Sequence, residues 1–160
     1  MNKLFSLLLL CAITVLACSK DEIPEPNVPE LTEAERMQLE QEIEAIKQYL
    51  SNKGWVADFQ DESGVFVMIT QEGDGGDHPN LNSNVRVKYK GYDLSEDVFD
   101  SNANGVTFPL NGLILGWQIG IPYFTKGTKG VLLIPSYLAY RNNSPSNGAP
   151  IVFEIELVDF

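Results

Sequence analysis

The chain has 160 residues, 44% of them hydrophobic, which is enough for one globular domain with short appendages. Its formal net charge of -11 at pH 7 would repel a phosphate backbone, and this excludes nucleic acid as a partner. The only cysteines are Cys11 and Cys18 and the only histidine is His78, so we expect neither a metal site nor a catalytic thiol.

Residues 1–17 have the build of a secretory signal peptide, in which Lys3 precedes an apolar stretch at residues 4–17. This stretch is shorter than a permanent membrane-spanning helix, which needs about 20 apolar residues. Its end, Leu16-Ala17-Cys18, resembles the lipobox of bacterial lipoproteins. The resemblance implies cleavage before Cys18 and acyl chains on Cys18, which would anchor the protein to a membrane. The alternative is an ordinary cleaved signal peptide with an unmodified cysteine.

Residues 18–31 contain three prolines among acidic side chains, and we interpret them as an extended tether that holds the domain off the membrane. The tether includes Lys20-Asp21-Glu22, which looks like the surface-export signal of some bacterial lipoproteins. A plain polar spacer explains these three residues equally well. We therefore expect a lipid-anchored protein of the bacterial cell envelope, attached to the outer membrane. The sequence does not decide between its periplasmic side and its surface side.

Residues 32–54 are expected to form an amphipathic helix. Thr32 followed three residues later by Glu35 is a capping box, and Gly54 is a typical C-terminal cap. Apolar side chains recur along one helical face at Leu39, Ile43, Ile46 and Leu50. We predict that this face packs against the chain's own domain, which favours a monomer over a dimer formed through the helix.

Residues 55–160 are expected to form one α+β domain. Apolar residues now recur at every second position, as in strands, and turn residues separate these short apolar segments. Residues 65–70 are apolar almost throughout, which predicts a strand buried on both faces. The Gly- and Asp-rich loop around His78 lacks the pattern of a calcium loop and is interpreted as a solvated turn. Further strands are predicted at residues 85–94, 98–100, 106–110, 129–134 and 151–158, with a turn at 102–105 and a short helix at 113–119. The result is an antiparallel sheet of five or six strands wrapped on a short helix.

Six segments in this domain together resemble the FKBP-type peptidyl-prolyl cis-trans isomerases over roughly the last hundred residues. They are residues 85–91, 98–101, 108–110, 113–117, 134–140 and 151–157. The resemblance implies an FKBP-like fold and an isomerase that needs no cofactor. It also implies that the partners are proline-containing segments of exported proteins, and that a macrolide of the FK506 class could bind in the same pocket.

The resemblance assigns roles to individual residues of this pocket. Trp117 would be the floor on which the prolyl ring stacks. Its walls would be Tyr89, Phe99 and Phe153. Leu113 and Ile114 would line the rim, and the Ile114 amide would donate to a substrate carbonyl. Tyr140 would donate its hydroxyl to the carbonyl of the rotating amide, Asp100 would accept a hydrogen bond from Tyr89 at the pocket edge, and Val106 would contact substrate where the family often has another aromatic residue.

Core packing alone would also explain some of these residues. Phe99 and Phe153 lie at inward positions of strands, so core and functional interpretations are equally good for them. Trp117 follows Gly116 at the start of a short helix, where a core does not obviously need the largest side chain. Tyr140 lies just after a strand, in a loop, where functional residues concentrate. For Trp117 and Tyr140 the functional interpretation is therefore preferred.

The chain departs from the family pattern at a few positions near this pocket. Arg141 stands where a glycine usually follows the tyrosine, and we expect it to send the flap loop at residues 141–150 along another course. Asn111 replaces a common glycine, Val106 opens one wall, and no arginine closely follows Asp100. These changes bear on catalytic efficiency and substrate preference more than on the fold.

Three functions remain to be compared. The first is a lipid-anchored prolyl isomerase that assists the folding of exported or envelope proteins. The second is a binding module that captures proline-containing segments with little turnover, as a chaperone or as an assembly subunit of an envelope machine; some gliding-motility lipoproteins resemble this build. The third, a structural adhesin-like β-domain, explains the anchor but neither Trp117 nor Tyr140. The sequence leaves the first two open.

Overall fold

The computed structural model describes residues 25–141, 145 and 147–160, so the predicted signal peptide and Cys18 lie outside the described residues. Two helices, six strands and three short 3-10 turns form the described part of the chain. In chain order the elements are α1 (Glu33–Lys53), β1 (Phe59–Gln60), β2 (Phe66–Gln71), β3 (Asn84–Asp93), β4 (Val98–Pro109), η1 (Leu110–Gly112), α2 (Leu115–Gly120), η2 (Ile121–Tyr123), β5 (Lys129–Ile134), η3 (Ser136–Leu138) and β6 (Ile151–Asp159).

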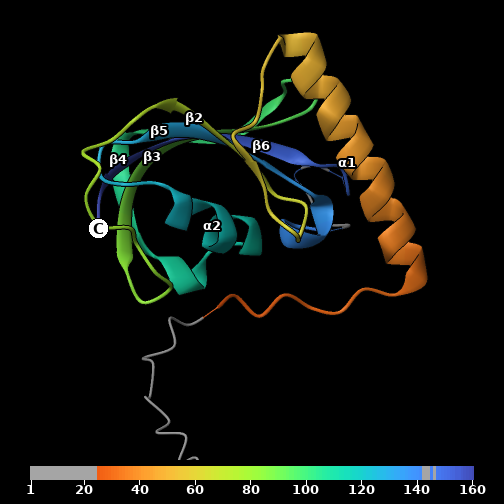
Figure 1. Ribbon diagram of the computed structural model, residues 1–160, viewed down its shortest axis with the longest axis horizontal. Coiled ribbons are helices and arrows are strands. Elements are labelled where there is room, and N and C mark those ends of the chain that lie inside the picture. The colour runs from red at the N-terminus through yellow and green to blue at the C-terminus, as the bar shows by residue number, and fades with distance from the viewer. Residues whose placement is uncertain (1–24, 142–144, 146) are drawn as a thin grey trace, which may run out of the picture.

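The six strands form one antiparallel sheet in the order β1-β2-β5-β6-β3-β4, which confirms the predicted α+β class. The sheet curves around α2, while α1 packs outside the curve (Figure 1). The predicted two-sided burial near β2 is confirmed, because alternate side chains enter different cores. Val65 and Val67 belong to the core that contains α2, whereas Phe66 and Met68 belong to the core that contains α1.

Helix α1 begins and ends as its sequence predicts. The Thr32 hydroxyl accepts from the Glu35 amide at 3.3 Å, and the Glu35 carboxylate accepts from the Thr32 amide at 2.9 Å. Gly54 caps the C-terminus with a φ of 69°. The buried face includes Ile46 and Leu50, which pack against the outer face of the sheet. The helix therefore packs on its own domain. Among the described residues no helix is long and apolar enough to cross a membrane.

The predicted turn at residues 102–105 is wrong, because β4 continues through it as a bulge. The pairing with β3 changes from Val87 opposite Val106 to Tyr89 opposite Asn102. The Asn102 side chain accepts hydrogen bonds from the Asn104 and Gly105 amides, at 3.1 and 2.9 Å. The residues of this segment therefore form hydrogen bonds with one another, and β4 continues to pair with β3 before and after the bulge. The two-residue strand β1 was not predicted, since so short a segment has no measurable period.

Helix α2 is shorter than predicted and lies very close to the sheet. Its N-cap, Ile114, has an extended backbone, so the helix begins at Leu115. A Cβ atom placed on Gly116 would come within 2.3 Å of the buried Ile134 side chain, which belongs to β5. A glycine is therefore required here for α2 to approach the strand, and Trp117 follows it directly.

We expect Gly116→Ala to lower the free energy of unfolding by about 1–3 kcal/mol, because the added methyl must displace the packed Ile134 side chain. The loss is expected although alanine is favoured over glycine by about 1 kcal/mol within a helix. Urea denaturation followed by circular dichroism measures the change. Gly112→Ala is the control, since its Cβ would meet only an ordinary contact at 3.5 Å and should alter stability by less than about 0.5 kcal/mol. Equal stabilities of the two variants would contradict the close approach of α2.

Candidate functional site

A cleft of about 130 Å³ opens between α2, the adjoining strands and the segment after η3. Apart from Phe99 and Val106, all the pocket residues that the resemblance named line this cleft. The lining residues are Tyr89, Asp100, Phe108, Leu113, Ile114, Trp117, Tyr140 and Phe153. They span 64 positions of the chain, from Tyr89 to Phe153.

Three interlocked aromatic rings form the floor and one wall of the cleft. Trp117 is only 4% exposed and Phe153 only 2%. Their ring centroids lie 5.0 Å apart, and Tyr89 lies 5.3 Å from Trp117, both pairs in edge-to-face geometry. Each such pair contributes about 0.5–1.5 kcal/mol beyond the area it buries. The floor is therefore a rigid apolar surface rather than a set of mobile side chains.

Phe99 packs against two of the aromatic rings that line the cleft. Its ring lies 5.6 Å from Phe153 and 6.2 Å from Tyr140, again edge to face, but it is not among the residues that line the cavity. Its packing on Phe153 and Tyr140 holds these two lining rings in place. The structure therefore places Phe99 in contact with two lining rings, although Phe99 itself is not among the residues that line the cavity.

Val106 is also absent from the lining, and Phe108 lies there instead. Val106 pairs with Val87 and Phe108 with Val85, and the two share one face of β4 because strand residues alternate. Phe108 is the nearer of the two, along the chain, to the rim residue Leu113. Sequence reasoning used Phe108 for the resemblance without giving it a role; its two-residue spacing from Val106 was the available signal.

The polar groups at the cleft edge are two tyrosines and one carboxylate. The Tyr89 hydroxyl donates to Asp100 Oδ2 at 2.8 Å. Burial, reinforced by this hydrogen bond, raises the pKa of Tyr89 to about 12. Burial and the Asp100 charge also raise the pKa of Tyr140 above its ordinary value. Both tyrosines therefore keep their protons, and their ability to donate, at neutral pH.

Arg141, which follows Tyr140, adopts the left-handed backbone region with a φ of 51°. Arginine therefore stands here in a backbone conformation that glycine adopts more readily. The Arg141 amide donates to the Ser136 carbonyl at 2.8 Å, and its guanidinium lies 3.4 Å from the Glu35 carboxylate. These contacts offset the modest strain of a left-handed residue. Residues 142–144 and 146 of the flap loop that follows lie outside the described residues.

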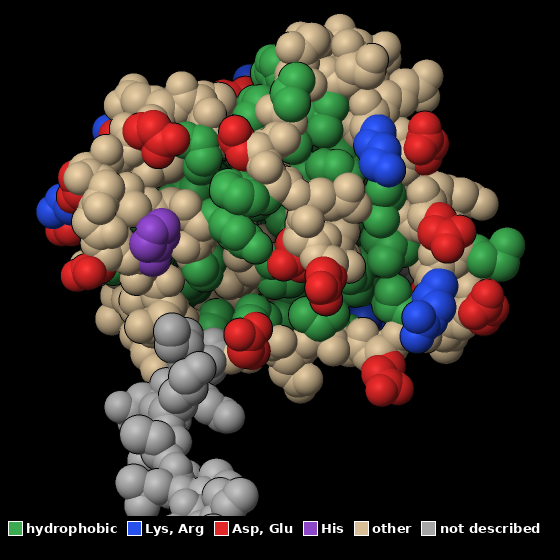
Figure 2. Space-filling model, in the orientation of Figure 1, with side chains coloured by type: hydrophobic (Ala, Val, Ile, Leu, Met, Phe, Trp, Pro, Cys, Tyr) green, Lys and Arg blue, Asp and Glu red, His purple; other side chains and the backbone are tan. Residues whose placement is uncertain are grey.

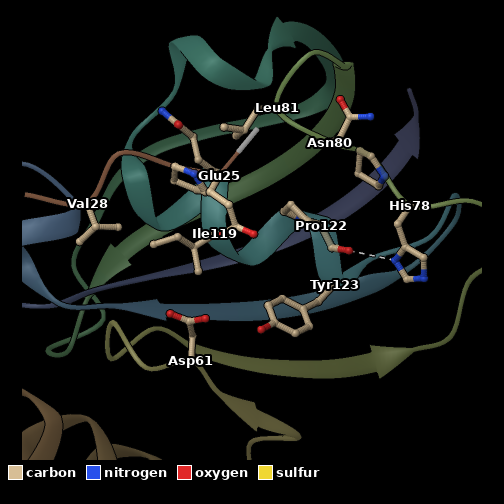
Figure 3. Close-up of a pocket in the computed structure, with 12 residues that line it drawn as sticks. Glu25, Val28, Asp61, His78, Asn80, Leu81, Ile119, Pro122 and Tyr123 are labelled. Atoms are coloured by element: carbon tan, nitrogen blue, oxygen red, sulfur yellow. Dashed lines mark hydrogen bonds between the residues drawn. The ribbon is translucent and has the colours of Figure 1, made fainter. Parts of the chain in front are cut away.

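A second and larger cavity, of about 500 Å³, lies against the part of α2 beyond Trp117 (Figure 3). Asp61 and Tyr123 line one side of it and Leu81 the other, and residues 25–28 of the predicted tether close it. Figure 2 shows hydrophobic side chains gathered in the central part of this face, with acidic and a few basic side chains around them.

Several polar groups of this larger cavity are already hydrogen-bonded within the protein. Asp61 accepts hydrogen bonds from the amide and hydroxyl of Ser63, and His78 Nδ1 lies 2.9 Å from the Pro122 carbonyl oxygen. Within the described part of the chain, the only buried polar side-chain atoms without a partner are Tyr49 Oη and Trp117 Nε1, and neither residue lines this cavity. No group of three metal-ligating side chains gathers among the described residues. We therefore take the smaller aromatic cleft as the candidate site.

We expect Tyr89 to titrate near pH 12 rather than near 10. Asp100→Asn should lower this pKa, because it removes the carboxylate, but should leave it above 10, because burial is the larger cause. The protonated hydroxyl is the favoured form in the fold, so its contribution to stability is complete below pH 10 and is lost as pH rises towards 12. The pH dependence of the Tyr89 ring resonances by NMR measures the pKa. A wild-type value near 10 would contradict this environment.

Comparisons with known proteins agree with this geometry. Residues 75–158 match the sequence model of the family described as FKBP-type peptidyl-prolyl cis-trans isomerase. The chain is 36% identical over 104 residues to the isomerase FkpA of Buchnera aphidicola subsp. Schizaphis graminum, covering 61% of this chain and 41% of the relative. It is 36% identical over 105 residues to the 22 kDa isomerase of Escherichia coli, covering 61% and 50%. The chain thus spans half or less of the length of these two relatives.

A shorter relative and two solved structures complete the comparison. A probable FK506-binding protein of Corynebacterium glutamicum is 43% identical over 81 residues, 46% of this chain and 69% of the relative. The crystal structure of FkpA from Escherichia coli superposes with a TM-score of 0.65 at 26% identity, covering 78% of this chain and 61% of that one. A peptidyl-prolyl cis-trans isomerase structure from Pseudomonas syringae gives 0.62 at 27% identity, covering 75% and 93%. The chain therefore belongs to the FKBP-type peptidyl-prolyl cis-trans isomerase family.

Proposed function

We propose that the protein is a peptidyl-prolyl cis-trans isomerase. The observation that carries the proposal is the aromatic cleft, in which Trp117 forms a buried floor and Tyr89, Tyr140 and Phe153 enclose the space above it. A space of about 130 Å³ suits one prolyl ring better than a large ligand. Membership of the family, together with these residues at its cleft, supports the activity.

The reaction is rotation about an X-Pro amide bond. Its barrier of about 18–20 kcal/mol arises because rotation breaks amide resonance. The twisted amide has a less polar carbonyl than the planar amide, so it loses less when water is removed. A dry aromatic cleft therefore favours the twisted form relative to the planar ground state, and catalysis is the difference between the two. The step forms no covalent bond to the protein.

Hydrogen-bond donors at the rim would orient the substrate in this cleft. Tyr140 is half-buried and stays protonated at neutral pH, so its hydroxyl can donate to the carbonyl of the rotating amide. Ile114 is the N-cap of α2, and we propose that its backbone N–H donates to a second substrate carbonyl. Asp100 accepts from Tyr89 and so fixes the ring that forms the opposite wall.

We further propose that the protein acts in the bacterial cell envelope, as a lipid-anchored monomer that assists the folding of exported proteins. The lipobox-like end of the N-terminal segment, Leu16-Ala17-Cys18, supports the anchor. The coil at residues 25–32 has the lack of regular structure that a tether requires. The apolar face of α1 is covered by the sheet of the same chain, which leaves little of it for a helix-mediated dimer.

We expect Tyr140→Phe to lower kcat/KM for a proline peptide about tenfold or less, because one hydrogen bond contributes only about 0.5–1.5 kcal/mol net. Trp117→Ala should cost more, since it removes both the stacking surface and the exclusion of water. For scale, a 10⁶-fold acceleration would correspond to a barrier lowered by about 8 kcal/mol. A protease-coupled or NMR exchange assay on a proline peptide measures the rates. Tyr123→Phe and Trp55→Ala are the matched controls, since neither residue lines the cleft, and both should retain activity.

The same assay separates the two functions that the sequence left open. A folded wild-type protein that binds a proline peptide or a macrolide of the FK506 class, but does not accelerate rotation, would be a binding module. Binding is read from the change in tryptophan fluorescence, because Trp117 lines the cleft that the ligand would fill. A folded protein that neither isomerises nor binds would overturn the assignment of this cleft altogether.

For the anchor, we expect Cys18→Ala to abolish incorporation of a radiolabelled fatty acid and to leave an uncleaved or unlipidated precursor. The reason is that the thiol of Cys18 is the acceptor of the first acyl chains. Cys11→Ala is the control, because Cys11 lies in the segment that would be removed, and it should still be labelled. Label retained by Cys18→Ala would show that the lipobox assignment is wrong.

A further inference from the structure

Helix α1 lies outside residues 75–158, yet it sends a carboxylate into the domain. Glu42 is only 8% exposed. One carboxylate oxygen accepts from the Ser136 amide at 2.7 Å, and the other accepts from the Ser136 hydroxyl at 2.6 Å. The side chain of Gln38 donates to the same carboxylate at 2.8 Å. No ion pair found among the described residues includes Glu42.

A buried carboxylate without a cationic partner is costly, because it leaves the hydration it has in water. Here three donors replace that hydration, and two of them belong to one residue, Ser136. Hydrogen bonds to a charged group are roughly twice as strong as those between neutral groups. The carboxylate of Glu42 therefore fixes the position of Ser136 more firmly than an ordinary helix contact would.

Ser136 in turn holds the segment that carries Tyr140. It is the first residue of η3, directly after β5 and Pro135. Its carbonyl accepts from the Ala139 amide at 3.1 Å and from the Arg141 amide at 2.8 Å, the residues on either side of Tyr140. The Ser136 amide is thus bound by Glu42, and the Ser136 carbonyl is bound by the two neighbours of Tyr140.

Two weaker contacts reach the same segment. The guanidinium of Arg141 lies 3.4 Å from the Glu35 carboxylate, two helical turns before Glu42 on α1. The Tyr137 hydroxyl donates to the Ser63 carbonyl at 2.6 Å. The pair with Arg141 is exposed and so contributes little by itself. Its position nevertheless places a second contact of α1 directly after Tyr140.

We infer that Glu42 is a positioning residue for the isomerase reaction, holding Ser136 so that the Tyr140 hydroxyl stays over the cleft. The inference rests on the proposed function. Glu42 touches no cleft-lining residue through the hydrogen bonds described and acts only through Ser136. An element outside the family-matched residues would thereby set the geometry of the donor in the site.

A double-mutant cycle tests this inference with Glu42→Gln, Tyr140→Phe and the double variant. If Glu42 acts through the Tyr140 hydroxyl, Glu42→Gln should lower kcat/KM in the wild-type background by no more than Tyr140→Phe does, about tenfold at most. In the Tyr140→Phe background the same change should cost less than about twofold, since the hydroxyl it positions is already absent. Glu44→Gln, an exposed carboxylate on the same helix, is the control and should leave both values unchanged.

A general loss of stability would give a different pattern. Equal fold losses in the two backgrounds would show that Glu42 only stabilises the fold, and no loss in the wild-type background would show that it has no role in positioning. Thermal melting of each variant confirms that the assay temperature lies below unfolding. If Glu42→Gln does not fold, Ser136→Ala is the second variant; it removes the hydroxyl bond to Glu42, keeps the amide bond, and should show the same non-additive pattern with Tyr140→Phe.

A second measurement does not depend on activity. We expect Glu42→Gln to speed hydrogen exchange of the Ser136 and Arg141 amides about tenfold or more, and Glu44→Gln to leave them unchanged. Unchanged exchange in Glu42→Gln would overturn the inference. If the wild-type protein fails to isomerise a proline peptide, the proposed function fails, while the exchange rates still decide whether Glu42 holds this segment.

Discussion

The close approach of α2 to β5 is the constraint on which the cleft depends. A Cβ atom on Gly116 would lie 2.3 Å from Ile134, and one on Gly120 would lie 2.6 Å from Leu132. Because the helix presents no side chain at these two positions, its backbone lies directly against the side chains of Ile134 and Leu132, deep in the curve of the sheet. Trp117, between these glycines, is thereby pressed against Phe153 of β6. The absence of side chains at the two glycines therefore sets the depth of the cleft floor. The other aromatic rings then pack around Trp117.

Local patterns in the sequence predict a large part of this fold. The capping box at Thr32, the period of two in β3 and β6, and the apolar run of β2 each depend on neighbours within a few positions, so their structural consequence can be read locally. Trp117 and Tyr140 were expected at the pocket from their places in the sequence, and both line the cleft. Chain order and spacing carried the resemblance, and the family comparison covers the same residues.

The features that could not be predicted depend on long-range contacts, or on residues that form hydrogen bonds with their own neighbours in the chain. Asn102 and Gly105 have turn chemistry, but β3 and the bulge keep them within a strand, and pairing of that kind is not visible in one segment. Phe108 lines the cavity where Val106 was expected, and Phe99 contacts two lining rings without lining the cavity itself, because side-chain size and strand register decide which residue reaches the cavity. The bond from Glu42 to Ser136 joins residues 94 positions apart, and in the sequence Glu42 is merely one acid on a helix rich in acids.

The position of Tyr140 depends on supports from two sides. Phe99 packs against its ring from the cleft wall, and the Ser136 carbonyl binds the amides on either side of it. The first support belongs to β4, within the family-matched residues, whereas the second is completed by α1, outside them. The contact with Phe99 restrains the Tyr140 ring, whereas the hydrogen bonds restrain the backbone on either side of that ring. Hydrogen bonds depend on angle as well as distance, so they fix the direction in which this backbone presents the side chain. The aromatic core of the family can therefore build the cleft, while the added helix determines how sharply its hydroxyl donor is aimed.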